Sequence, residues 1–258
     1  MQSELKIAMV QKDIAWQDAQ QNRRQLDVLF AQMHAVDLIV LPEMFTTGFS
    51  MLPQAIAETM QGETVAWMLQ TAKQQRAALV GSLSIEEDGL YYNRLLFVTP
   101  EGTISSYDKR HTFALAGEHE AYTAGAKKLV VDFRGWKICP LICYDLRFPV
   151  WSRNVEQYDA LLYVANWPMP RIKAWNTLLK ARAIENMSYC IGVNRVGVDA
   201  NRYTYSGNSM ALDYTGNEMT PVCEHKEALL YACFSKDTLH KFRRKLPFLE
   251  DQDRFEIR

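Results

Sequence analysis

Three residues have the types needed for nucleophilic catalysis, and each stands where an apolar segment ends. They are Glu43, Lys109 and Cys143. In layered α/β proteins, ligands bind beyond the carboxyl ends of strands, so residues at such positions can meet in one site. There a cysteine can attack a carbonyl carbon, a glutamate can act as general base, and a lysine ammonium can stabilise an oxyanion.

Each of these residues also has an ordinary structural explanation when taken alone. A glutamate or lysine in this setting is commonly a solvated turn residue, and a free cysteine is commonly buried in a core. The segment after Cys143 favours the catalytic reading. It is a polar turn, Tyr144–Pro149, that leads into a predicted helix and offers backbone N–H groups for an oxyanion hole. The other cysteines are predicted to be structural: Cys139, Cys190, Cys223 and Cys233.

The histidines leave two alternatives open. His111 or His119 could pair with Cys143 as in a papain-like hydrolase. His111, Glu118 and His119 could also be imagined as a metal cluster, but they lack a recognisable ligand spacing. The sequence contains no Gly-rich phosphate loop and no Gly-x-Ser-x-Gly elbow. We therefore expect neither a metal nor an organic cofactor.

Hydrophobic periodicity switches repeatedly between that of strands and that of helices, which predicts an α/β protein with mixed sheets. Helices are predicted at Asn22–His34, Gly62–Gln75 and Lys173–Tyr189, and a short basic helix after Lys236. Strands are predicted at Leu5–Val10, Asp37–Glu43, Ala78–Ile85, Leu95–Thr99, Thr103–Tyr107, Leu129–Phe133, Trp136–Ile142, Ala160–Ala165, Cys190–Arg195, Ser209–Asp213 and Leu229–Phe234.

Composition narrows the function classes. The 258 residues carry a formal net charge of -1, without the basic excess typical of nucleic-acid binding, and the cluster Lys241–Lys245 is predicted to be a solvated helix face. The N-terminus does not resemble a signal peptide, and no apolar run approaches the roughly 18 residues of a membrane span. Five cysteines, an odd number, favour reduced thiols. We expect a cytoplasmic protein with a single domain over residues 1–258.

The motifs around these residues, taken in order, resemble the nitrilase superfamily of carbon–nitrogen hydrolases. Each motif is weak alone, but their order and spacing along nearly the whole chain are specific. They are Leu41–Phe45, Gly48–Phe49, Tyr107–His111, Gly117–Glu118, Ile142–Pro149, Ala165–Pro168, Arg182–Asn186 and Ser206–Ser209.

The resemblance implies a four-layer α-β-β-α sandwich that forms a homodimer by packing helices, here within Pro149–Asn154 and Lys173–Tyr189. It also implies a catalytic triad of Glu43, Lys109 and Cys143, with Glu118 as a second glutamate beside it. The chain looks most like the omega-amidase branch, whose members hydrolyse the terminal amide of 2-oxoglutaramate and 2-oxosuccinamate through a cysteine thioester. Related amidases that act on deaminated glutathione or N-carbamoyl compounds remain alternatives, as does a catalytically silent interaction protein.

Substrate-binding residues follow from this expectation. The backbone N–H of Tyr144 would join Lys109 in binding the oxyanion. A substrate carboxylate needs a partner once water is excluded, and Arg147 or Arg171 could supply it. We expect apolar walls from three aromatic side chains: Phe45, Phe148 and Trp167.

Overall fold

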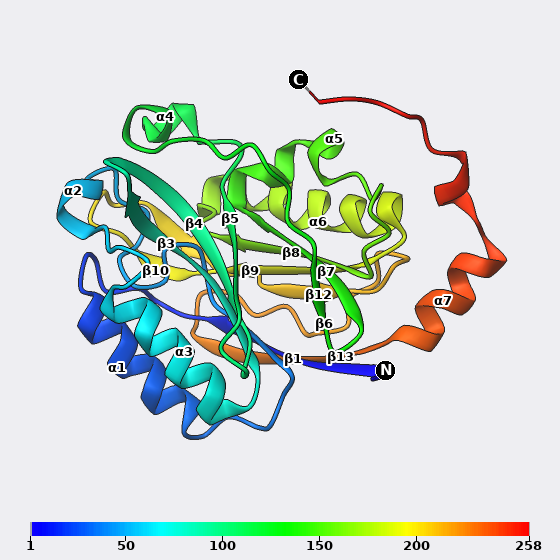
Figure 1. Ribbon diagram of the computed structural model, residues 1–258, viewed down its shortest axis with the longest axis horizontal. Helices are drawn as coiled ribbons and strands as arrows, with labels where there is room; N and C mark the ends of the chain where they lie inside the picture. The colour runs from blue at the N-terminus through cyan, green and yellow to red at the C-terminus, as the bar shows by residue number, and fades with distance from the viewer. Residues whose placement is uncertain (1, 258) are drawn as a thin grey trace.

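The computed structural model describes residues 2–257 and contains two β-sheets that lie face to face, with helices on both outer surfaces (Figure 1). This is the four-layer α-β-β-α sandwich that the sequence predicts. Two such sheets bury one face against each other and the other against helices, which accounts for the nearly continuous apolar runs of the central strands.

One sheet has six strands in the order β13-β1-β2-β3-β4-β5. Strands β1, β2 and β3 are parallel to one another, and the remaining neighbours are antiparallel. The bounds are β1 (Glu4–Gln11), β2 (Leu38–Val40), β3 (Ala78–Glu87), β4 (Leu90–Val98), β5 (Ile104–Asp108) and β13 (Ala228–Ser235).

The second sheet has five strands in the order β12-β9-β8-β7-β6, and its central strands β7, β8 and β9 are parallel. A separate hairpin is formed by β10 (Val196–Val198) and β11 (Thr204–Ser206). The bounds in the second sheet are β6 (Val131–Phe133), β7 (Trp136–Ile142), β8 (Ala160–Ala165), β9 (Tyr189–Asn194) and β12 (Met210–Leu212).

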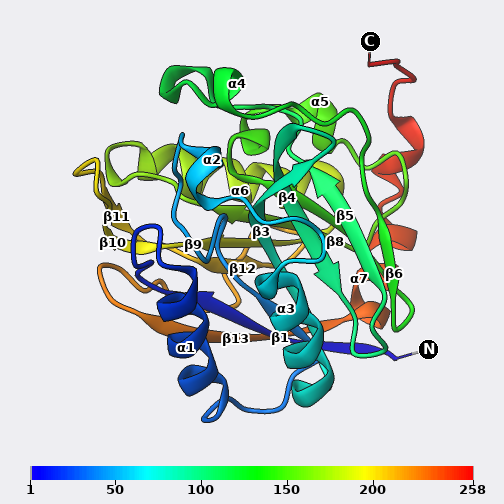
Figure 2. The same cartoon turned by 60° about the vertical axis from the view of Figure 1, so that its left-hand side comes forward.

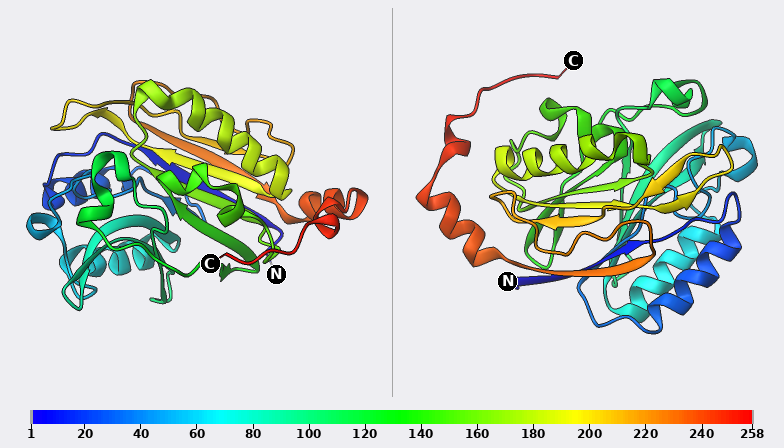
Figure 3. Two further views of the ribbon diagram at one scale, coloured as in Figure 1. Left: turned by 90° about the horizontal axis from the view of Figure 1, so that it is seen from above. Right: turned by 180° about the vertical axis from the view of Figure 1, so that it is seen from behind.

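Helices cover the two outer faces. Helices α1 (Ala19–Phe30) and α3 (Glu63–Gln75) lie side by side on the six-stranded sheet (Figure 2), and α6 (Ile172–Asn186) covers the five-stranded sheet. Short helices stand in the connections: α2 (Pro53–Ile56), α4 (Glu118–Ala121) and α5 (Pro149–Ser152). Helix α7 (Lys236–Lys245) and the segment after it extend beyond the sandwich (Figure 3). None of the described helices is long and apolar enough to cross a membrane.

The hydrophobic core consists of two clusters, because side chains along each strand point alternately to the two faces of the sheet. Ile7 and Met9 of β1 belong to the cluster between the sheets, together with Trp136 of β7. Ile39 of β2 instead belongs to a second cluster, beneath α1 and α3, with Met68. Successive strand residues point to opposite faces, so each strand contributes to both layers of core and its end is held firmly in place.

The observed elements differ from the prediction in several places. Strand β2 ends at Val40 and does not reach Glu43, and α6 ends at Asn186 because Tyr189 begins β9. The short helices α2 and α4 were not predicted. Strand β4 begins at Leu90 rather than Leu95, because Asn93 and Arg94 are buried polar residues inside the strand. The β10–β11 hairpin was not predicted, because strands of three residues are too short to show a periodicity of two.

Candidate active site

Glu43 lies fully buried just beyond the end of β2, and both of its carboxylate oxygens accept hydrogen bonds. Oε1 accepts from Lys109 Nζ at 2.9 Å and from Asn93 Nδ2 at 2.8 Å. Oε2 accepts from the backbone N–H of Asn166 at 2.9 Å. These donors fix the orientation of the carboxylate.

Lys109 follows β5 and carries its ammonium between two carboxylates. Nζ lies 2.9 Å from Glu43 Oε1 and 2.8 Å from Glu118 Oε2, and the side chain is 1% exposed. Burial by itself would lower the pKa of Lys109, but the charges of Glu118 and Glu43 outweigh it, and the pKa lies above its ordinary value. The ammonium is therefore a permanent positive charge in a dry site, where its field is weakly screened.

Glu118 stands at the first residue of α4, and its side chain is also fully buried. Asn93 Nδ2 donates to its Oε1 at 3.0 Å, so this one amide holds both glutamates. Burial raises the pKa of Glu118, Lys109 opposes the shift, and Glu43 adds to it. The two carboxylates share one cation, and the charge of Glu43 disfavours the ionised form of Glu118.

Cys143 opens a 3₁₀ turn (Cys143–Arg147) directly after β7 and has a φ of 42°. This left-handed backbone conformation is rare for a residue with a side chain, and such strain is kept where the surrounding structure holds it. Burial raises the pKa of the Cys143 thiol well above its ordinary value, and the charge of Glu43 raises it further while Lys109 lowers it. The resting group is a neutral thiol, so its attack requires a base.

Hydrogen bonds to Asp145 connect the turn that begins at Cys143 with the segment that contains Lys109. Its carboxylate accepts from the backbone N–H of Ile142 at 3.0 Å, from Tyr107 Oη at 2.7 Å and from the backbone N–H of His111 at 3.0 Å. Tyr107 and His111 flank Lys109 in the sequence. The nucleophile and the lysine are thus joined through a single buried carboxylate.

The two histidines that were alternatives to the triad have other partners. The His111 ring lies 2.7 Å from Asp145 Oδ1 and stacks on Phe148 with ring centroids 3.6 Å apart. His119 is half exposed and lies beside Glu120. Because Glu118 points instead to Lys109, these side chains diverge and do not form a metal cluster within residues 2–257.

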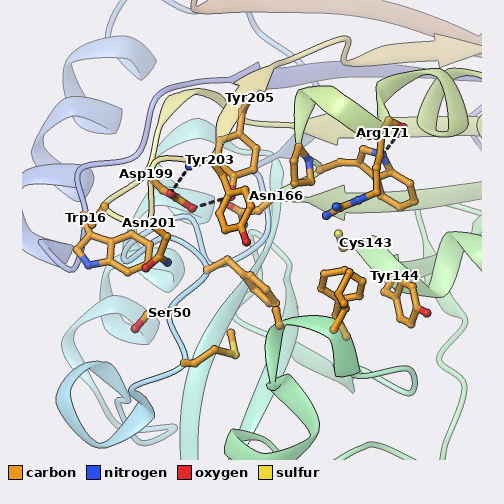
Figure 4. A pocket seen from close by; sticks show the side chains of 18 of the residues that line it. Trp16, Ser50, Cys143, Tyr144, Asn166, Arg171, Asp199, Asn201, Tyr203 and Tyr205 are labelled. Carbon is orange, nitrogen blue, oxygen red and sulfur yellow. Dashed lines mark hydrogen bonds between the residues drawn. The ribbon is translucent and has the colours of Figure 1, made fainter.

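A cavity of about 650 Å³ opens onto Cys143. Cys143 and Tyr144 lie at one end, and Trp16 and Asn201 lie at the other (Figure 4). The remaining lining residues come from several loops, and the charged or aromatic ones among them are Phe49, Lys109, Phe113, Arg147, Trp167, Arg171, Asp199, Tyr203 and Tyr205. The cavity is large enough for a substrate much longer than a simple amide.

Three of the predicted substrate-binding residues do line this cavity. The guanidinium of Arg147 lies 4.9 Å from the centre of the Trp167 ring, and that of Arg171 lies 5.3 Å from the Phe113 ring. Trp167 Nε1 donates to the backbone carbonyl of Arg171 at 2.8 Å. Both arginines are thereby held by aromatic rings near Cys143.

The two predicted phenylalanine walls lie elsewhere. Phe45 is 2% exposed and packs beneath α3, with its ring centroid 5.9 Å from that of Trp67. The chain turns at Met44, whose φ is 44°, so Phe45 points into the core behind the site. Phe148 stacks on His111 and supports the Tyr144 ring, 5.2 Å away, without lining the cavity. Their places within the motifs of Glu43 and Cys143 did not indicate which way these side chains point.

Sequence reasoning missed three polar residues that hold the site: Asn93, Asp145 and Asn166. Asn166 Nδ2 donates to the backbone carbonyl of Glu43 at 2.6 Å, in addition to the backbone contact already described. A signal existed for Asn93, since asparagine is unfavourable inside a strand and this one interrupts an apolar run. Asp145 and Asn166 stood in the quoted motifs, but spacing alone did not reveal their partners.

The chain belongs to the carbon-nitrogen hydrolase family, since residues 6–244 match that family. Among curated proteins it is 47% identical to "Omega-amidase YafV" from Yersinia enterocolitica over 255 residues, which is 98% of each chain. It is 30% identical to "2-oxoglutaramate amidase" from Bacillus subtilis over 252 residues, or 95% of this chain and 96% of that protein.

A solved structure agrees with this assignment. XC1258 from Xanthomonas campestris, a CN-hydrolase superfamily protein with an arsenic adduct in its active site, is 41% identical and superposes with a TM-score of 0.97, covering 100% of both chains. The predicted fold class and family are confirmed. The chain has the fold and the sequence of an amide-hydrolysing enzyme family.

Proposed function

We propose that this protein is an omega-amidase that hydrolyses the terminal amide of short 2-oxo acids, with 2-oxoglutaramate and 2-oxosuccinamate as substrates. The observation that carries this proposal is a buried Glu43–Lys109 pair whose charges act on the thiol of Cys143, at the end of an open cavity that Lys109 and Cys143 both line. The names of the relatives supply the substrate class. A catalytically silent interaction protein would have no need to keep this buried charge cluster.

In the first half of the reaction, Glu43 takes the thiol proton while Cys143 Sγ attacks the amide carbonyl carbon. The oxyanion is stabilised by Lys109 Nζ and by the backbone N–H of Tyr144, since N–H groups in the first turn of a helix have no partner inside it. Glu43 then passes its proton to the departing nitrogen. Ammonia leaves, and a thioester of Cys143 remains.

In the second half, a water molecule attacks the thioester carbonyl. Glu43 accepts a proton from this water and returns it to the sulfur as the C–S bond breaks. Glu118 acts through Lys109, because it holds the ammonium against Glu43 while the charge on Glu43 changes. All of these steps use groups of the chain and water alone.

Recognition of the acid end depends on the two arginines near Cys143. Arg147 and Arg171 form no salt bridge with any carboxylate among residues 2–257, so each guanidinium is available to an anionic substrate. A carboxylate moved out of water into such a cavity needs a charged partner. Glutamine carries an additional ammonium, which these two cations disfavour.

The test is an ammonia-release assay with a panel of amides. We expect kcat/KM for 2-oxoglutaramate to exceed that for glutamine and asparagine by a large factor. The panel also contains deaminated glutathione, an N-carbamoyl amino acid and a simple nitrile. A clear preference for either of the first two would assign the protein to another amidase branch and refute the substrate proposed here.

We further propose that the chain is a single-domain cytoplasmic enzyme that works as a homodimer. Exposed Val150 on α5 and exposed Ile184 on α6 support an interface at the predicted helices, and the free cysteines suit a reducing compartment. Sedimentation equilibrium at micromolar concentration should give twice the chain mass. A monomer under those conditions would contradict the dimer and leave the catalytic proposal intact.

A further inference from the structure

The cavity has opposite charges at its two ends. Arg171 lies near Cys143, whereas the far end contains the carboxylate of Asp199 (Figure 4). Arg147 ends the turn that Cys143 begins, so it belongs to the same end as Cys143. A short anionic acid held by the arginines leaves this far end unfilled. We call the far end the distal chamber and define it by five lining residues: Trp16, Asp199, Asn201, Tyr203 and Tyr205.

Asp199 is fixed by the hairpin that carries it. Its side chain accepts from the backbone N–H of Tyr203 at 2.9 Å and from Tyr205 Oη at 2.8 Å, and the residue is 6% exposed. Burial and the charge of Asp199 both raise the pKa of Tyr205, so the phenol stays protonated and donates to the carboxylate. A carboxylate has about four acceptor positions, so Asp199 can bind a further donor.

Arg195 is fully buried, and its guanidinium lies 4.7 Å from the centre of the Tyr205 ring. Its Nη2 binds Asp13 Oδ1 at 2.7 Å, and its Nη1 has no hydrogen-bond partner among the described residues. No salt bridge to Asp199 exists within the described part of the chain. A carboxylate among aromatic faces, without a salt bridge of its own, is a setting that attracts an ammonium.

We propose that the distal chamber binds the protonated end of a linear amine whose other end is the nitrogen of the substrate amide. Binding of an amine in the distal chamber does not depend on which acyl group the enzyme accepts. The reaction described next rests on the proposed function. The acid end of the substrate cannot take this place, because Asp199 would repel a carboxylate while the arginines attract it.

The chemistry runs in both directions through the same thioester. An omega-amide substituted on nitrogen by an aminoalkyl chain would release a diamine in place of ammonia. In reverse, the free amine nitrogen forms a C–N bond with the thioester carbonyl as the C–S bond breaks. Its proton passes through Glu43 to the sulfur of Cys143, so an amide and a thiol result without any further reactant.

Binding is tested first, without turnover. The probe is 1,5-diaminopentane, titrated by calorimetry into the wild type, Asp199→Asn and Asp213→Asn. Asp213 is a matched control, because its carboxylate likewise accepts bonds within a turn, from Thr215 and Asn217, but does not line the cavity. We expect Asp199→Asn to bind roughly tenfold more weakly, as for the loss of a charge-assisted contact, and Asp213→Asn to match the wild type. Equal binding by all three would overturn the site.

Aminolysis is tested second, with 2-oxoglutaramate as acyl donor at an alkaline pH where both amines have a free nitrogen. Mass spectrometry compares the amide products from 1,5-diaminopentane and from 1-aminohexane, which has similar length but an uncharged end. The wild type should favour the diamine about tenfold, and Asp199→Asn should lose this preference. No preference in the wild type would overturn the proposal. If no ammonia is released at all, the proposed function fails, and the binding experiment still decides the chamber.

Discussion

The inner end of the cavity and its outer rim are built in contrasting ways. At the inner end, Glu43, Lys109 and Glu118 are almost completely buried, and their charged atoms are paired with one another or with amides. At the rim, Arg147 is exposed and Leu115 is 81% exposed. The groups proposed to act on the carbonyl are therefore oriented before a substrate arrives, whereas Arg147, one of the two arginines proposed to bind the substrate, faces solvent.

This contrast indicates where changes should affect chemistry and where they should affect binding. Charges held in a dry, fixed arrangement stabilise a transition state without reorganising. Exposed charges are screened by water and contribute less. We therefore expect large losses in kcat from the inner end and smaller changes, mainly in KM, from the rim.

The largest effect should come from Cys143→Ala, because no other group in the site can form the thioester. Turnover should fall by several orders of magnitude while circular dichroism and thermal unfolding stay close to those of the wild type. Substantial residual turnover in a clean preparation would show that the nucleophile has been assigned incorrectly.

Glu43→Gln keeps the shape of the side chain and removes the base. Turnover should fall by about 10²–10⁴, the range for one general acid–base group. The Cys143 thiol should still react with an alkylating reagent. The charge of Glu43 raises the pKa of Cys143, so the substitution lowers that pKa and places more thiolate at neutral pH beside Lys109.

Iodoacetamide separates these two effects. In Glu43→Gln, the midpoint of alkylation against pH should shift to a lower pH than in the wild type, although turnover is lost. Cys139 serves as an internal control, since burial raises its pKa to about 12 and it should stay unlabelled in both proteins. A midpoint that moves upward would contradict the effect assigned to the Glu43 charge on the pKa of Cys143.

Lys109→Met should cost at least about 10²–10³ in kcat, as for loss of one oxyanion donor. It also leaves Glu43 and Glu118 buried without their cation, so the free energy of unfolding should fall as well. Adding Glu118→Gln removes one of the repelling charges and should recover stability without recovering kcat. Recovery of both would mean that Lys109 has only a structural role.

The α/β class could be predicted from periodicity, whereas the four-layer arrangement came from the family resemblance. Glu43 and Lys109 follow β2 and β5 of the six-stranded sheet, and Cys143 follows β7 of the other sheet, so packing of the two sheets brings these strand ends together. The catalytic roles of the three residues stay a prediction. Polar partners were harder to predict. Asn93 contacts Glu43 from a distance of fifty positions in the chain, and Asp145 joins segments that no periodicity connects.

The direction of a side chain at a turn was the least predictable property. Phe45 lies two residues after Glu43, yet the positive φ of Met44 rotates it into the core. Arg147 lies in the turn after Cys143, whose φ is also positive, and Trp167 follows the end of β8, yet both line the cavity. A sequence gives the residue type at a turn but not the backbone angle, and the angle decides which face the side chain occupies.

At the rim, Arg147→Met and Arg171→Met should each raise KM for 2-oxoglutaramate, by roughly tenfold for the arginine that binds the carboxylate, with a smaller change in kcat. Methionine keeps much of the apolar stem that packs on Trp167 or Phe113. The variant with the larger effect identifies the carboxylate partner. If neither changes KM, recognition of the acid end lies elsewhere in the cavity.

The smallest effect on activity should come from Phe45→Leu, which changes a side chain once expected to form a wall of the site. Phe45 fills the space that a Cβ on Gly81 would occupy and packs beneath α3, so the smaller leucine leaves a void in the core. The cost should be about 1–2 kcal/mol in the free energy of unfolding, below that of Phe→Ala changes. KM for 2-oxoglutaramate should stay within about twofold, since the ring does not reach the cavity. Urea unfolding and steady-state kinetics measure both quantities. A raised KM with unchanged stability would show that Phe45 contacts the substrate. It would also contradict the contrast between a buried inner end that carries out the chemistry and an exposed rim that binds the substrate.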